Sequence, residues 1–159
     1  MTTRPARAGG GAPRAVKKDR RRRAREAALQ ILYQWDVGRL DIDRACETFF
    51  ELQWPDAQPP PEALRAFASA LARDTVSRLD RIDALVAETA EHWRPERMAV
   101  LDRLILRMAV CELLRDTLMP PAVVINEALE LARTFSTEDA VKFINGMLDG
   151  IRKKLGQRS

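Results

Sequence analysis

The stretch that decides the fold is LDRLILRMAVCELL, residues 101 to 114. At 100° per residue its large apolar side chains fall on two opposite faces of a helix: Leu101, Leu104, Ile105 and Met108 on one, and Leu106, Val110 and Leu113 on the other. A helix that is apolar on two sides is usually enclosed by its neighbours. The stretch therefore predicts a central helix, over about residues 96–116, against which the other elements pack.

Apolar residues spaced three and four apart predict six more helices, and no segment alternates as a strand would. The expected ranges are 20–37, 43–53, 62–78, 80–93, 122–135 and 137–155. Seven helices with short connections predict an all-α domain of two small antiparallel bundles that share the central helix. The expected division is a disordered basic arm over 1–18, a helical domain over 19–156 and a tail over 157–159.

Capping residues and prolines predict where these helices begin and end. Gly38 is expected to end the first helix as a left-handed cap, and Pro95 to open the central helix. Asp43 and Ser136 are expected as N-caps of the second and seventh helices, with Asp139 at the capping-box position. The stretch WPDAQPPPE, residues 54–62, is expected to be a surface loop because four prolines remove helical donors.

Composition excludes several classes of function. No apolar run approaches the roughly 20 residues that span a bilayer, and residues 1–23 lack the apolar core of a secretory signal, so a cytoplasmic protein without membrane contact is expected. Two cysteines, Cys46 and Cys111, and one histidine, His92, are too few and too far apart for a zinc site. We expect buried thiols and no cofactor.

Charge divides the chain unevenly. Residues 1–25 hold ten Lys or Arg against one acid, whereas the other 134 residues hold 17 basic and 22 acidic side chains. Four consecutive arginines, Arg20 to Arg23, ring the expected first turn of a helix, where cations are unfavourable. Because they point in different directions, no single neighbouring carboxylate can neutralise them all. This favours contact with nucleic acid, with a solvated terminus or an anionic membrane surface as alternatives.

Two further helix faces have unusual composition. Phe143, Gly146 and Gly150 share a stripe with Asp139 on the seventh helix, and glycines inside a helix cost about 1 kcal/mol each. Either a neighbouring helix packs closely there, or an RNA base stacks on the phenylalanine. On the first helix, Leu29 and Tyr33 project opposite the core stripe, so they either pack under another helix or receive a protein partner.

Catalytic groupings are not evident. His92 lies at a helix end beside Trp93, and most acids occupy solvated helix faces. Glu112 is the exception, because it shares the apolar face of Ile105 and Met108; we expect a buried, paired carboxylate that bridges helices. An enzyme is therefore not expected, and a DNA reader is disfavoured because no polar recognition helix lies beside the basic run.

Four stretches together resemble one family. RRRAREAALQILYQWD (21–36), LDRLILRMAVCELL (101–114), PPAVVINEALELARTFS (120–136) and KFINGMLDGI (142–151) occur in the order typical of the bacterial NusB family of transcription antitermination factors. The resemblance covers about residues 20–155 and implies a non-enzymatic, two-bundle helical protein. It also implies that the protein binds single-stranded boxA RNA of ribosomal transcripts together with NusE, a small-subunit ribosomal protein, within the RNA polymerase antitermination complex.

The resemblance also implies roles for individual residues. Arg21, Arg22, Arg23 and Arg25 would contact phosphates, to which the charge argument adds Arg20. Asp139 and Phe143 would lie near the RNA, and Tyr33 and Asp102 would face NusE. The role of the long arm and the formation of a homodimer by the free protein stay open. The alternative function is a helical adaptor that binds proteins without touching RNA.

Overall fold

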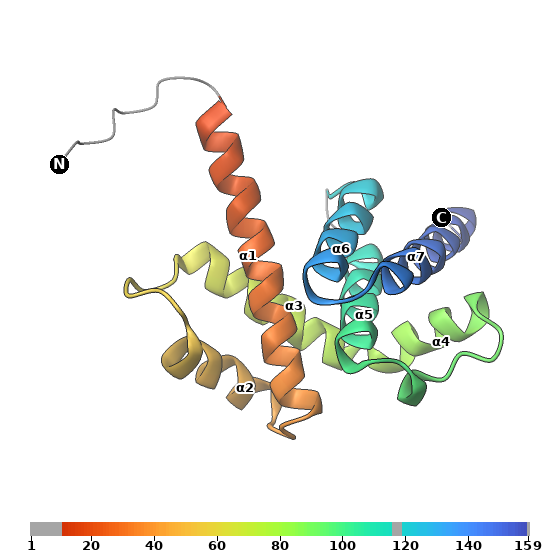
Figure 1. Cartoon of the computed structure of the whole chain (residues 1–159), viewed down its shortest axis with the longest axis horizontal. Coiled ribbons are helices and arrows are strands. Elements are labelled where there is room, and N and C mark those ends of the chain that lie inside the picture. Colours follow the sequence, from red (N-terminus) through yellow and green to blue (C-terminus); the bar gives the residue numbers. More distant parts are fainter. Residues whose placement is uncertain (1–10, 116–118, 159) are drawn as a thin grey trace.

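The structure, a computed structural model, describes residues 11–115 and 119–158 (Figure 1). Within these ranges the chain forms seven α-helices and no strand, which confirms the all-α class. The helices are α1 (Gly11–Asp36), α2 (Ile42–Thr48), α3 (Glu62–Ser77), α4 (Leu79–Thr89), α5 (Val100–Leu114), α6 (Pro121–Phe135) and α7 (Glu138–Arg158). A π-helical turn, η1 (Phe49–Gln53), extends α2, and a 3₁₀ turn, η2 (Pro95–Arg97), precedes α5.

Helix α5 is the centre of the molecule. Every residue from Leu104 to Glu112 is buried. On one side α5 contacts α1 and α3, which pack with α2; on the other it contacts α4, α6 and α7 (Figure 1). This arrangement confirms the two bundles that share a helix, and the two-faced apolar pattern of residues 101–114 is its cause.

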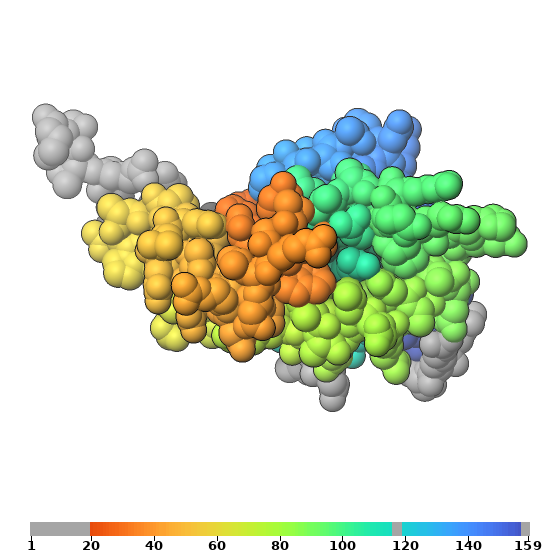
Figure 2. Space-filling view, turned by 90° about the horizontal axis from the view of Figure 1, so that it is seen from below, coloured from red at the N-terminus to blue at the C-terminus, as the bar shows by residue number. Residues whose placement is uncertain are grey.

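Figure 2 shows the molecule from below, with orange residues of the N-terminal part of the chain in the middle of this face. The orange residues near the end of α1 lie between the yellow segment that follows α2 and the green residues of α4 and α5.

Both cysteines, Cys46 and Cys111, are buried and unpaired thiols, as expected. None of the described helices combines the length and the hydropathy that a membrane span requires.

Helix α1 begins at Gly11, well before the expected start near residue 20. The expectation of disorder across residues 1–18 is therefore wrong for 11–18, while 1–10 lie outside the described residues. Pro13 is tolerated because it falls in the first turn, and the alanines, lysines and arginines that follow favour helix. Arg20 consequently lies more than two turns inside α1, beyond the reach of the helix dipole at its N-terminus.

Several predicted caps differ from those in the structure. The left-handed residue after α1 is Arg39, with φ of 57°, and not Gly38. Gly38 is nevertheless required, because a Cβ there would lie 2.7 Å from the carbonyl oxygen of Gln34. At α2 the N-cap is Asp41, whose side chain accepts a hydrogen bond from the backbone N–H of Asp43.

Three further element ends differ from those predicted from the sequence. Pro95 opens η2 rather than α5, and α4 ends at Thr89 because Ala90 is extended and His92 has a φ of 65°. At α7 the capping side chain is that of Thr137, which accepts from the N–H of Ala140 at 3.1 Å. The hydroxyl of Ser136 instead donates to Asp102 on α5.

Candidate nucleic-acid interface

The arginines of α1 are divided between the interior and the surface. Arg25 is 2% exposed, and its Nε and Nη2 donate to the two carboxylate oxygens of Glu112 at 2.8 Å each. This confirms that Glu112, 8% exposed, is a buried carboxylate that bridges helices. Both Glu112 oxygens thus engage the Arg25 guanidinium, so a phosphate would have to compete with this buried ion pair to make the contact expected of Arg25.

Two more arginines have carboxylate partners within the chain. Arg22 donates from Nε and Nη2 to the oxygens of Glu127 on α6, at 3.3 and 3.0 Å. Arg23 donates to Asp56 at 2.6 Å, and its guanidinium carbon lies 4.9 Å from the ring centroid of Trp54. The four arginines do point in different directions, as expected, but two of them meet separate acids.

Arg20 and Arg21 differ from these, because no ion pair with either is found among the described residues. Both side chains are exposed. The Arg21 guanidinium carbon lies 4.6 Å from the ring centroid of Phe67 on α3, a cation–π contact that does not neutralise its charge. These two guanidinium groups are therefore available to an external anion.

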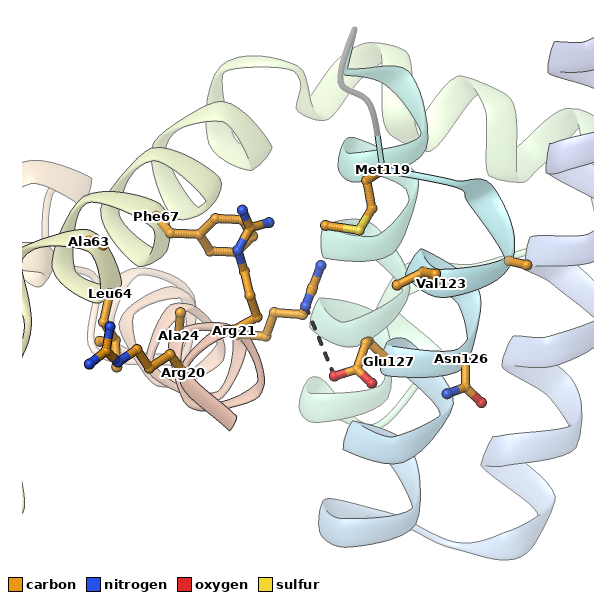
Figure 3. Close-up of a pocket in the computed structure, with 12 residues that line it drawn as sticks. Arg20, Arg21, Ala24, Ala63, Leu64, Phe67, Met119, Val123, Asn126 and Glu127 are labelled. Atoms are coloured by element: carbon orange, nitrogen blue, oxygen red, sulfur yellow. Dashed lines mark ion pairs between the residues drawn. The ribbon is translucent and has the colours of Figure 1, made fainter. Parts of the chain in front are cut away.

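An apolar groove with a basic mouth lies between the two bundles (Figure 3). Its volume is about 780 Å³, within the range typical of ligand sites. Arg20, Arg21 and Phe67 line it from α1 and α3, and Figure 3 shows Met119 and Val123 across from them on the α6 side. The groove brings together Arg20, Arg21 and Arg25 of the predicted set.

The predicted residues of α7 lie elsewhere. Asp139 and Phe143 are exposed, the latter by 41%, and neither lines the groove. The close approach expected along their stripe occurs at Gly150, where an added Cβ would lie 2.8 Å from Cγ2 of Thr89 on α4. At Gly146 an added Cβ would meet nothing within 4 Å. Phe143 and Gly146 thus form an open surface, and Gly150 packs against a helix.

The predicted partner-facing residues are Tyr33, near the C-terminal end of α1, and Asp102, in the first turn of α5. Tyr33 is 38% exposed, whereas Leu29, expected on the same side, is buried under neighbouring helices. Asp102 is half-buried and accepts a hydrogen bond from Ser136. Next to it in the chain, Arg103 donates to Asp36 at 2.6 Å and so ties the end of α1 to α5.

Sequence reasoning missed two acids of this site, Glu127 and Asp56. Glu127 falls three residues after Val124 and four before Leu131, both buried, so its place on the core face of α6 was a usable signal. Asp56 lies in a proline-rich loop without periodicity, and nothing in the sequence indicates its contact with Arg23. No group of acids, cysteines and histidine that could hold a metal ion occurs in the part of the chain described.

The fold and this site define an all-helical, two-bundle protein with a basic groove where the bundles meet. Comparison with known proteins identifies the family. The NusB family model matches residues 22–153, and the chain belongs to the NusB family.

Curated relatives and solved structures agree with this assignment. The transcription antitermination protein NusB of Koribacter versatilis is 44% identical over 140 residues, which cover 88% of this chain and 93% of the relative. That of Solibacter usitatus is 44% identical over 135 residues, covering 85% and 90%. Such proteins are regulatory factors rather than enzymes.

Two solved structures are similar over most of the chain. The NusB of T. maritima superposes with a TM-score of 0.74 at 33% identity, covering 84% of this chain and 91% of that one. A crystal structure of the antitermination factors NusB and NusE in complex with double-stranded RNA gives a TM-score of 0.72 at 25% identity, covering 86% and 98%.

Proposed function

We propose that this protein is a transcription antitermination factor that binds boxA-type RNA of ribosomal transcripts together with NusE, in the cytoplasm. The observation that carries the proposal is the pair of exposed guanidinium groups, Arg20 and Arg21, at the mouth of the groove. Phosphates are the anions that such groups neutralise along a nucleic-acid strand, with release of counterions. Family membership supports the same role.

The site residues divide by what their contacts permit. Arg20 and Arg21 contact phosphates directly, and Arg23 joins them once a phosphate displaces Asp56. Arg22 holds α1 against α6 through Glu127, and Arg25 holds it against α5 through Glu112. These two pairs set the orientation of Arg20 and Arg21. Asp139 and Phe143 offer a second contact region on α7, where an exposed ring can stack on a base.

The NusE contact is proposed for the other end of α1. Tyr33 and Asp102 are the residues assigned to it, and support comes from a similar solved structure in which NusB and NusE are in complex with RNA. The resulting complex acts on RNA polymerase that is transcribing ribosomal RNA, and helps it to read through terminators.

Titration of RNA and NusE, separately and together, tests this function. We expect RNA affinity to rise when NusE is present, and NusE affinity to rise by the same factor when RNA is present. Arg20→Ala with Arg21→Ala should weaken RNA binding alone, whereas Tyr33→Ala should weaken NusE binding alone.

Light scattering of the RNA-free protein decides whether it forms a homodimer, which would double the monomer mass.

The exposed aromatic residues favour one second candidate, a helical adaptor that binds only proteins. Tyr33, Phe135 and Phe143 are each more than a third exposed, and such side chains are enriched in protein interfaces. An adaptor would bind NusE normally and would ignore boxA RNA at low salt even with NusE present.

A further inference from the structure

The groove between α1, α3 and α6 contains a stacked arginine–phenylalanine pair, which neutralisation of phosphate charge does not require. The guanidinium plane of Arg21 is backed by the ring of Phe67, with 4.6 Å between guanidinium carbon and ring centroid. Arg25 also lies near this ring, at 5.3 Å. A guanidinium plane supported in this way loses little further freedom when a second flat group stacks on it.

The wall opposite Arg21 is apolar and open. Figure 3 shows Val123 and Met119 facing the groove from the α6 side, and Val123 is 42% exposed. Ala63, Ala122 and Leu64 complete the apolar lining. A flat heterocycle between Arg21 and Val123 would cover this exposed apolar surface while stacking on a cation.

Charge favours RNA over a protein side chain as the occupant. Among the described residues, Glu127 is the only carboxylate that lines the groove. Both of its oxygens accept from Arg22 and it lies 4.0 Å from Arg25, so it does not repel phosphate. Arg20 and Arg21 leave the mouth positive. The exposed amide of Asn126, which can both donate and accept hydrogen bonds, also lines the groove.

We propose that this groove is a nucleobase pocket: one base of the bound single-stranded RNA turns out of the strand and stacks on the Arg21–Phe67 pair, against Val123. The proposal rests on the proposed function, and adds to it a site that reads a single position. Unstacked bases that lie on aromatic rings or arginine planes are the usual means by which proteins recognise single-stranded RNA.

The test uses the full chain and a series of single-stranded boxA RNAs, each lacking one base but keeping every phosphate. Fluorescence anisotropy measures the affinity of each RNA for the wild type and for Arg21→Lys, which keeps the charge but removes the plane. Arg44→Lys is the matched control, because it makes the same exchange at an exposed arginine of α2 that does not line the groove.

We expect one base-free position to weaken wild-type binding by roughly fivefold or more, as loss of a stacked base does. Arg21→Lys should lose a similar factor on the intact RNA, lose nothing further at that position and keep the wild-type salt dependence. Arg44→Lys should behave as the wild type within about twofold throughout.

The outcomes separate the two proposals. If the wild type binds RNA with a normal salt dependence but no base-free position matters, or if Arg21→Lys keeps the same positional pattern, the base pocket is refuted and RNA binding stands. Loss of NusE binding alone in Arg21→Lys would assign the groove to a protein and also refute the pocket. No RNA binding at low salt would overturn the proposed function itself.

Discussion

Arg25 and Glu112, 87 residues apart in the chain, face each other in the interior with two hydrogen bonds of 2.8 Å. The pair joins α1 to α5 and so fixes the helix that carries the exposed arginines to the centre of the fold. A buried ion pair of this kind contributes less as a net stabiliser than as a constraint, because removal of one partner leaves an uncompensated charge.

Glu112→Gln should therefore be strongly destabilising. We expect the free energy of unfolding to fall by about 3–5 kcal/mol, since Arg25 would be left charged and buried. Urea denaturation followed by circular dichroism measures the change. As a control, Glu130→Gln removes an exposed acid paired with Arg133 on the same helix and should cost about 0.5 kcal/mol or less. Equal small effects of both variants would contradict this view of the pair.

Two of the three glycines of α7, Gly146 and Gly150, should respond in opposite ways to alanine. Gly146→Ala should raise the free energy of unfolding by up to about 1 kcal/mol, because alanine favours helix and its Cβ meets nothing. Gly150→Ala should not, because its Cβ would lie 2.8 Å from Cγ2 of Thr89. Adding Thr89→Ser to Gly150→Ala removes that methyl group and should recover the gain. If Gly150→Ala alone stabilised the protein, Thr89 and α4 would be able to move away from the added Cβ at little cost, and the prediction would be wrong.

Thr137→Ala should weaken the start of α7. Its hydroxyl caps the N–H of Ala140 at 3.1 Å, and loss of such a cap costs about 1 kcal/mol. Thr134→Ala is the matched control, because that hydroxyl donates to the carbonyl of Glu130 within its own helix. Thermal unfolding compares the two variants, and equal midpoints would show that Thr137 is not the effective cap.

The cysteines should be unreactive in the folded protein. Burial raises the pKa of the Cys46 and Cys111 thiols, because desolvation disfavours the thiolate. We expect an aromatic disulfide reagent to label both slowly at neutral pH and both promptly after unfolding in urea. Since folding raises these pKa values, the stability that the neutral thiols contribute is present below their ordinary pKa and lost as pH rises through the folded one. Prompt labelling of either native thiol would contradict this.

Periodicity was sufficient to predict the core but not the ends of the elements. The central position of α5 and the pairing of Glu112 followed from apolar spacing alone. The burial of Arg25 had a signal as well, because Ala28, Leu29 and Leu32 lie three, four and seven residues after it and are all buried. Arg25 nevertheless follows a run of arginines. When only the sequence is considered, that run favours an exposed, anion-binding role over a buried ion pair.

Other features had no local signal. Residues 11–18 lack an apolar period, so their helical structure could not be predicted from packing. The shift from Ser136 to Thr137 as the cap of α7 is a single residue, which is within the ordinary uncertainty of helix ends. The contact of Asp56 with Arg23 depends on how a loop folds back, which no spacing rule predicts.

The salt dependence of RNA binding tests the central claim that Arg20 and Arg21 contact phosphates. Affinity for boxA RNA is measured across a range of salt concentrations for the wild type, for Arg20→Ala with Arg21→Ala, and for Arg44→Ala with Arg81→Ala, an exposed pair on α2 and α4 that carries the same charge. We predict that the log–log slope becomes shallower by roughly 1.4 in the first variant, about 0.7 for each phosphate no longer neutralised, and stays unchanged in the second. An unchanged slope in the first variant, or equal flattening in both, would contradict the account.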